Sequence, residues 1–295
     1  MNLIPITYHS KKYPAGVISN IDEIAGNFDK DSINPQRKYS LHTEYSHMKR
    51  KLDNQLINKY PELKSSERDN VPQLWKNKEW AKEFANFIIE LIGNNLSPEI
   101  IEIHPPFNDY CNTFSDFFDI YGEFEKIILK KFPNVKIFIE NRCGTFYRWG
   151  KFIISNGKSI IQFLEELQKR NLNLKLVLDY PQVFSAEAIK MDDIKLKKII
   201  NFNNNIKEYI SYIGGFHLWG KKKSQTGRWT SHTGDLNTFF SNNDLLKDEF
   251  INSVIDIFDD NIVRYFVPEV NSGEEDLQSI INDLLKYDIK FKLDD

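Results

Sequence analysis

The chain has 295 residues, 41% of them hydrophobic and 27% charged, with a formal net charge of -3 and a pI near 6.1. This length fits one α/β barrel or two smaller domains, and the hydrophobic fraction is sufficient for a core of either kind. The slightly acidic balance gives no global attraction to nucleic acid, although a local basic patch at Lys221–Lys223 and Arg228 is compatible with it.

The two cysteines, Cys111 and Cys143, are too few for a disulfide framework, and there is no C-x-x-C pair for a thiolate metal site. No apolar run approaches the roughly 18 residues that a membrane helix needs, and the N-terminus lacks the pattern of a signal peptide. We therefore expect a cytoplasmic protein that does not bind membranes.

Eight short apolar runs, bounded by turn residues or prolines, are typical of buried strands. They are Leu3–Tyr8, Tyr39–Leu41, Glu99–Ile103, Val135–Ile139, Leu174–Leu178, Tyr212–His217, Val263–Val267 and Ile289–Leu293. Helical spacing or caps between them predict a weak helix at 21–28 and helices at 71–92, 114–132, 159–168, 245–258 and 272–287, with two pieces divided near Asp192. Two of these helices are assigned capping boxes, Ser159 with Gln162 and Ser272 with Glu275. A long polar loop is expected at about 46–70.

Strands that alternate with helices predict a parallel sheet, because each parallel crossover needs a connection of a dozen or more residues. Eight such units favour a single α/β domain over residues 1–295, a (β/α)8 TIM barrel whose final helix is absent. No G-x-G-x-x-G loop follows a strand, which argues against a dinucleotide-binding fold.

Polar residues that can bind metals stand at the carboxyl ends of the predicted strands. These residues are His9, His42, His104, Glu140, Asp179, His217, Glu269 and Asp294, and His232 lies in the loop after His217. Barrel strands deliver their carboxyl ends to one rim, so we expect these side chains to converge. Imidazole and carboxylate together suit zinc, manganese or iron, and a cation would relieve the repulsion between the acids.

Glu140, Asp179, His217 and Glu269 resemble the metal-binding quartet of the xylose isomerase-like barrels, a superfamily that includes sugar isomerases, epimerases and endonuclease IV. Local motifs resemble endonuclease IV most. These are His42-Thr-Glu-Tyr45, His104-Pro105, Glu140-Asn141-x-x-Gly144, His217-Leu218 with Lys222, and the separation of His217 from His232.

The chain departs from that family at Gln182, where the family has histidine, and at Thr230-Ser231-His232, where it has Asp-x-His. Both missing groups serve the family's third zinc. The resemblance therefore implies a mono- or dinuclear site, with His42, His104 and Glu140 for one ion and Glu140, Asp179, His217 and Glu269 for the other. Zinc is the expected metal, with manganese or cobalt as alternatives.

Two functions remain open from the sequence. The first is an endonuclease IV-like phosphodiesterase that acts on nucleic acid at abasic sites, with Glu140 and Glu269 as catalytic residues. Its expected substrate contacts are Tyr45, Arg142, Gln182, Lys222 and His232, with Arg228, Arg148, Tyr147 and Trp149 as further candidates. The second is a metal-dependent sugar isomerase or epimerase, in which the same two glutamates exchange a proton next to a carbonyl. A barrel that binds without catalysis is a third, less favoured interpretation.

Overall fold

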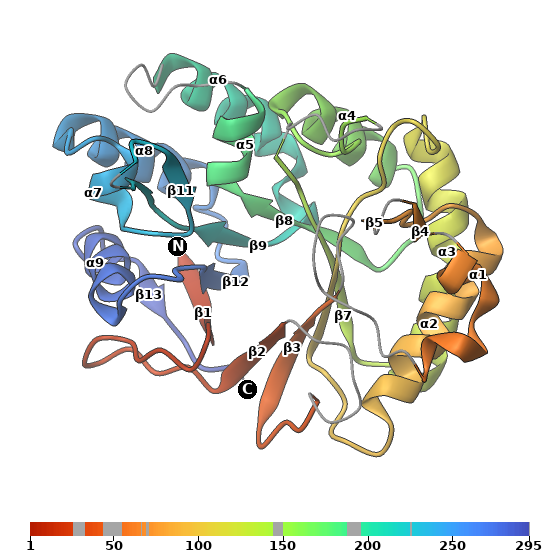
Figure 1. The fold of residues 1–295 in the computed structure, drawn as a ribbon. Helices are drawn as coiled ribbons and strands as arrows, with labels where there is room; N and C mark the ends of the chain where they lie inside the picture. Colours follow the sequence, from red (N-terminus) through yellow and green to blue (C-terminus); the bar gives the residue numbers. More distant parts are fainter. Residues whose placement is uncertain are drawn as a thin grey trace. The chain divides into compact units, whose positions relative to one another are not determined.

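The computed structural model describes residues 1–25, 33–43, 55–65, 67–68, 71–143, 150–187, 196–224 and 226–294. It divides into two compact units, which we call the central unit, Glu23–Leu176, and the terminal unit, formed by Met1–Asp22 with Val177–Asp295. Figure 1 shows the elements of both along the chain. No helix in the described ranges is both long and apolar enough to cross a bilayer.

Nine strands form one sheet in the order β12-β9-β8-β7-β6-β3-β2-β1-β13, and β12 also pairs with β1, so that the sheet closes. Its strands are β1 Asn2–Thr7, β2 Ile21–Ala25, β3 Lys38–His42, β6 Ile100–Ile103, β7 Lys136–Glu140, β8 Leu174–Asp179, β9 Ile213–Leu218, β12 Val263–Pro268 and β13 Lys290–Phe291. The predicted (β/α)8 fold is confirmed, but the expected absence of its final helix is wrong, because the helix α9, Glu274–Leu285, follows β12, the last strand of the closed ring.

One place in the ring is filled by a strand that the sequence pattern assigns to a helix. The prediction of a weak helix at 21–28 is wrong for residues 21–25, which form β2, with Ile21 paired to Ile6 of β1. A segment this short cannot support a helix without tertiary packing, whereas β-branched Ile21 and Ile24 suit a strand.

The predicted eighth barrel strand at 289–293 is also corrected. It shortens to the two residues of β13, which pair with Asn2 and Leu3 of β1. The same two β1 residues pair with β12, so β13 lies on the opposite edge of β1 from β12. The ring is therefore closed by the β12–β1 pairing, and β13 is not needed for it.

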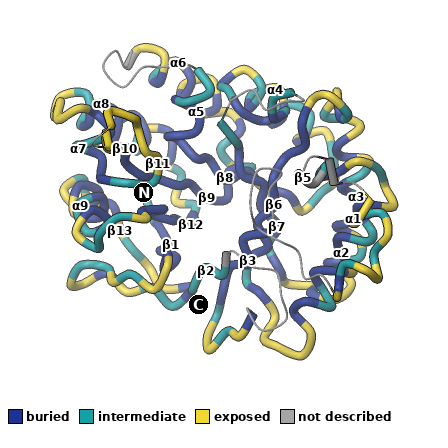
Figure 2. Tube along the Cα trace, in the orientation of Figure 1, coloured by how far each residue is buried: buried dark blue, intermediate teal, exposed yellow. Residues whose placement is uncertain are grey.

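In the central unit, two long amphipathic helices cover buried strands. The helix α2, Lys78–Ile92, begins after Asn77, whose side chain accepts a hydrogen bond from the backbone of Trp80, and ends at Gly93 with φ of 58°. It packs against α3, Phe114–Lys131. Figure 2 shows the strands β6 and β7 buried along most of their length.

Two predicted helix starts are corrected by the structure. The helix α4, Gly157–Leu167, is capped by Asn156, with Ser159 as the reciprocal partner, and not by Ser159 itself. The helix α9, Glu274–Leu285, begins after Gly273 without a side-chain cap. Ser272 instead donates a hydrogen bond to Asp276. The predicted capping boxes lie within a few residues of the observed helix starts. A capping box needs only a short polar residue followed by another polar residue three positions later, so the pattern also occurs by chance near a helix start.

The remaining elements are short or belong to the terminal unit. The polar stretch predicted as one long loop contains η1 Ile57–Lys59, α1 Pro61–Ser65 and β4 Glu67–Arg68, and β4 pairs with β5 Val71–Pro72. The helix predicted from residue 71 therefore starts at Lys78. The terminal unit contains α5 Tyr180–Ala186, α6 Leu196–Ile206, η3 Lys207–Tyr212, β10 Lys221–Lys223, β11 Trp229–Ser231, α7 Leu236–Phe239 and α8 Asp244–Ile257.

Candidate metal centre

Three neighbouring strands of the central unit deliver four polar side chains to one buried cluster. His42 ends β3, Glu140 ends β7, and His104 directly follows β6. Glu102 lies within β6, two residues before His104, so both point to the same side of the strand. All four residues are at most 5% exposed.

The donor atoms of this central cluster face one another. His42 Nε2 lies 3.0 Å from His104 Nε2, and His104 Nε2 lies 2.9 Å from Glu140 Oε2. His42 Nε2 is also 3.6 Å from Glu102 Oε1 and 3.8 Å from Glu140 Oε2. One ligand atom from each residue lies within 4.8 Å of all the others, which is the arrangement that a single metal ion requires.

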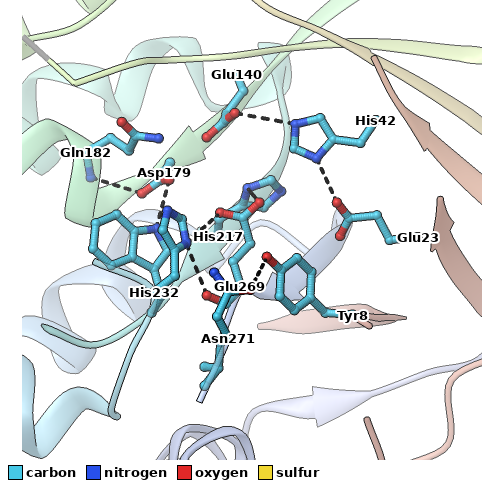
Figure 3. Close-up of polar contacts among 12 residues, drawn as sticks. Tyr8, Glu23, His42, Glu140, Asp179, Gln182, His217, His232, Glu269 and Asn271 are labelled. Carbon is cyan, nitrogen blue, oxygen red and sulfur yellow. Dashed lines mark hydrogen bonds and ion pairs between the residues drawn. The ribbon is translucent and has the colours of Figure 1, made fainter. Parts of the chain in front are cut away.

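His42 is oriented by a carboxylate on its other ring nitrogen. Its Nδ1 lies 2.7 Å from Oε1 of Glu23, a residue of β2 whose side chain is 3% exposed. Figure 3 shows His42 between Glu23 and Glu140. A carboxylate that accepts a hydrogen bond from Nδ1–H keeps the proton on Nδ1 and so leaves the Nε2 lone pair available to a metal. The pair thus presents Nε2 of His42 to the cluster.

Backbone contacts hold the strand ends that carry these ligands. Thr43 donates from both its backbone nitrogen and its hydroxyl to the carbonyl of Glu102. The indole of Trp75 donates to the carbonyl of His104 at 2.6 Å. Trp75 is fully buried, has a left-handed φ of 61°, and packs edge-on against Trp80, Phe117 and Phe124. The end of β6 is therefore tied to the aromatic core beneath α2 and α3.

Burial lowers the pKa of His104 to about 3, against a weaker raising effect from its hydrogen bond to Glu140, while the neighbouring His42 and Arg142 lower it further. His104 is therefore neutral at physiological pH, and neutral imidazole is the form that binds metals. Arg142 donates from Nη1 to Glu140 Oε2 at 3.0 Å. Two imidazoles and two buried carboxylates form a donor set that suits a divalent ion, and an ion offsets the cost of burying the acids.

The terminal unit holds a second group of metal-binding side chains. Asp179 ends β8, His217 lies in β9, and Glu269 follows β12, with His217 in register with Val267. Ligand atoms of these three residues lie within 4.8 Å of one another, and His217 Nδ1 is 3.5 Å from Glu269 Oε1. All three are nearly fully buried. This terminal cluster offers one imidazole and two carboxylates.

Asp179 is held on both of its oxygens. The indole of Trp219 donates to Oδ2, and the backbone nitrogen of Gln182 donates to Oδ1, both at 2.9 Å, so that Asp179 also caps α5. His232 stacks on Trp219 with 4.2 Å between ring centroids, and its Nδ1 lies 3.1 Å from the carbonyl oxygen of Glu269. Figure 3 shows Asp179, Gln182, His232 and Glu269. His232 therefore lies beside the terminal cluster, and its role as a substrate contact stays a prediction.

Several predicted contact residues are engaged with protein groups. Lys222 forms an ion pair with both carboxylate oxygens of Asp276 at 2.9 Å, and Gln182 is buried. Two of the predicted strand-end residues lie elsewhere in the terminal unit. Asp294 accepts a hydrogen bond from Tyr265, and His9 follows β1 with a φ of 49°. Tyr45, Tyr147, Arg148 and Trp149 lie outside the described residues. Arg228 lies in the exposed turn between β10 and β11.

Sequence reasoning missed Glu23 and Glu102. Glu102 could have been found, because a residue two before a strand-end histidine shares its face of the strand. Glu23 was hidden by the assignment of its segment to a helix. Its contact with His42 depends on β2, which local sequence does not indicate.

No family model matches the sequence, and no curated protein matches it. Solved structures do match. The structure described as AsfvAP:AG aligns with a TM-score of 0.53 at 12% identity over 97% of each chain. An AP endonuclease of family 2 from Brucella melitensis aligns with a TM-score of 0.50 at 8% identity, over 94% of this chain and 96% of that one. This chain shares their fold. At such low identity the likeness extends to the fold alone, and it is the fold that the resemblance to endonuclease IV and the xylose isomerase-like barrels implies.

Proposed function

We propose that this protein is a divalent-metal-dependent phosphodiesterase that cleaves nucleic acid at abasic sites. The observation that carries the proposal is the central cluster, in which His42, His104 and Glu140 place ligand atoms within 3.8 Å of one another. A sugar isomerase that works with one ion at a strand-end quartet has little use for two further histidines. The fold shared with an AP endonuclease is consistent with the proposal.

In this proposal the two clusters provide the metal ligands. His42, His104 and Glu140 hold one ion, and Asp179, His217 and Glu269 hold another. Zinc fits the mixture of imidazole and carboxylate donors best. When bound, the ions supply Lewis acidity, which stabilises the charge that develops during displacement at a phosphate.

The two acids of the terminal cluster contact different kinds of group. Asp179 is fixed by Trp219 and Gln182, whereas Glu269 carboxylate oxygens lie at 3.5 Å from His217 and from His232. We assign to Glu269 the role of accepting a proton from the attacking water, because its two carboxylate oxygens each lie 3.5 Å from an imidazole, that of His217 or that of His232. His232, only partly buried, is assigned to a phosphate oxygen of the substrate.

The hairpin formed by β10 and β11 supplies an exposed basic and aromatic surface beside His232 in the sequence. Lys223 lies over the ring of Trp229 at 4.9 Å, and Trp229 is 39% exposed. Cationic and aromatic side chains together suit a single-stranded or extruded nucleotide, through phosphate contact and base stacking. We propose that this hairpin contacts the nucleic acid, with Arg228 at its turn.

The alternative function is a sugar isomerase or epimerase. The observation that favours it is that the terminal cluster alone offers three ligands to one ion beside the stacked rings of Trp219 and His232. Aromatic faces pack against the apolar face of a sugar as well as against a base. In this case His104 would not be needed for turnover.

The deciding experiment uses the protein stripped by a chelator and reloaded with zinc, manganese or cobalt. It is incubated with a duplex that carries one abasic site, with an undamaged duplex, and with a panel of ketoses. We expect incision at the abasic site only, abolished in both Glu140→Gln and His104→Ala and retained in Glu99→Gln, a partly exposed glutamate near the start of β6. Ketose turnover that survives His104→Ala, without incision, would overturn the proposal in favour of the isomerase.

A further inference from the structure

We propose that Glu102 is a fourth protein ligand in the central cluster, so that His42, Glu102, His104 and Glu140 enclose one divalent ion completely. The inference rests on the proposed function for the presence of the ion, and it extends that function by assigning different work to the two clusters. Neither the strand-end pattern nor the resemblance to endonuclease IV includes Glu102.

The separations within the cluster fit a tetrahedron. Zinc bonds of about 2.0–2.2 Å to nitrogen and oxygen place neighbouring ligand atoms about 3.3–3.6 Å apart in tetrahedral geometry. Four of the six separations are 2.9, 3.0, 3.6 and 3.8 Å, on both sides of that range, and the two between Glu102 and the ligand atoms of His104 and Glu140 are within 4.8 Å. Glu102 Oε1, at 3.6 Å from His42 Nε2, is as well placed as Oε2 of Glu140.

The backbone gives Glu102 this position and leaves it little freedom. Glu102 is in register with His42 on the neighbouring strand, so the two side chains lie next to each other. Thr43 fixes the Glu102 carbonyl with two hydrogen bonds, at 2.9 Å from its nitrogen and 2.7 Å from its hydroxyl. Because Glu23 occupies the far nitrogen of His42, the imidazole Nε2 is directed towards Glu102, Glu140 and His104 together.

A complete set of four protein donors has a functional consequence. Closed sites leave no coordination position for water or substrate, whereas three-donor sites keep one open. The ion in the central cluster would then neutralise the buried carboxylates and stabilise the fold of its unit. The terminal cluster, with Asp179, His217 and Glu269, would be the one that binds water and substrate. Glu102 acts in this arrangement as a metal ligand and not as a catalytic residue.

The test is metal binding by the full-length chain, measured by competition with a chromophoric chelator. The background variant carries Asp179→Asn, His217→Ala and Glu269→Gln, so that only the central ligands remain. We expect about one zinc ion per chain in this background. Adding Glu102→Gln should weaken zinc binding by roughly 100-fold or more, since even loss of an outer contact costs about 10–100-fold. Adding Glu99→Gln instead is the matched control and should leave binding unchanged.

Cobalt replaces zinc as a probe of geometry. The background variant loaded with cobalt should show the intense visible absorption of four-coordinate ions, and Glu102→Gln should reduce it. Unchanged zinc affinity together with an unchanged cobalt spectrum in Glu102→Gln would overturn the inference. If that variant does not fold, as judged by circular dichroism, a weak six-coordinate spectrum in the background variant would overturn it equally.

Failure of this inference is distinguishable from failure of the proposed function. If the wild type incises abasic DNA and Glu102→Gln binds zinc with full affinity, Glu102 is not a ligand, and the proposed phosphodiesterase function is unaffected. Loss of zinc affinity in Glu102→Gln without incision of any abasic substrate would establish the four-ligand site and remove the phosphodiesterase.

Discussion

The two clusters of metal-binding side chains are built from the same kinds of residue but differ in number and support. The central cluster combines two imidazoles with two carboxylates, and its outer contacts are a carboxylate on His42 and an indole on the His104 carbonyl. The terminal cluster has one imidazole and two carboxylates, beside a half-buried histidine and an exposed hairpin. In our proposal the central cluster encloses its ion, and the terminal cluster leaves part of its ion accessible.

This difference shows that ligand identity alone does not assign a role to a metal cluster. Donor count decides whether a position stays open, and the outer contacts decide how firmly each ligand is oriented. The sequence contains comparable strand-end residues in both places, whereas the structure separates them by these two properties.

The largest expected effect is on the rate of incision, and it comes from a substitution in the terminal cluster. Glu269→Gln should lower the rate of abasic-site incision by about 10²–10⁴-fold, the usual contribution of a general base, while one zinc ion stays on the central cluster. Single-turnover incision and metal content measure the two quantities. Glu249→Gln, on the exposed face of α8, is the control. Loss of the zinc ion from the central cluster together with the incision rate would show that the two clusters do not bind their metals independently.

A packing substitution tests how firmly the central cluster is anchored. Trp75→Ala removes a fully buried indole that bonds to the His104 carbonyl, and should destabilise the protein by about 3–5 kcal/mol. Trp229→Ala, on the exposed hairpin of the terminal unit, should change stability by no more than about 0.5 kcal/mol. Urea denaturation of both variants gives the comparison, and similar losses would contradict it.

An outer contact is expected to have a smaller effect. Glu23→Gln keeps the shape of the side chain but removes the carboxylate that orients His42, and should weaken zinc binding at the central cluster by about 10–100-fold. Chelator competition on the variant without terminal ligands measures it. Zinc affinity that the Glu23→Gln substitution leaves unchanged would mean that strand packing alone orients His42.

The smallest expected effect is on the free energy of unfolding when one helix cap is removed in each unit, and on how that change depends on pH. Burial alone would raise the pKa of Asp235, but hydrogen bonds from Thr238, Ser279 and Asn237 hold it below its usual value. The carboxylate therefore stabilises the fold at neutral pH, and this contribution is lost as pH falls through the lowered pKa. Asp235→Ala should cost about 1 kcal/mol at pH 7 and less at pH 3, whereas Asn156→Ala, at the neutral cap of α4, should cost about the same at both. Denaturation at the two pH values tests this, and a cost at Asp235 that does not change with pH would contradict it.

The sequence by itself determined the alternation of strands and helices, and with it the closed parallel fold. Apolar runs such as those of β6 and β7 are buried on both faces, so their composition reveals them without tertiary information. It also determined that His42, His104 and Glu140 stand at strand ends, because chain order and strand limits are local properties. The structure brings these three together as the strand order requires.

Only the tertiary structure decided the membership of the ring and the outer parts of the site. The segment of β2 has a weak local pattern, and its strand conformation depends on pairing with β1, which is a long-range contact. The same pairing carries Glu23 to the far side of His42, and the register between β3 and β6 brings Glu102 beside that imidazole. Contacts of this kind depend on how separate strands are aligned, and no local pattern in the chain encodes that alignment.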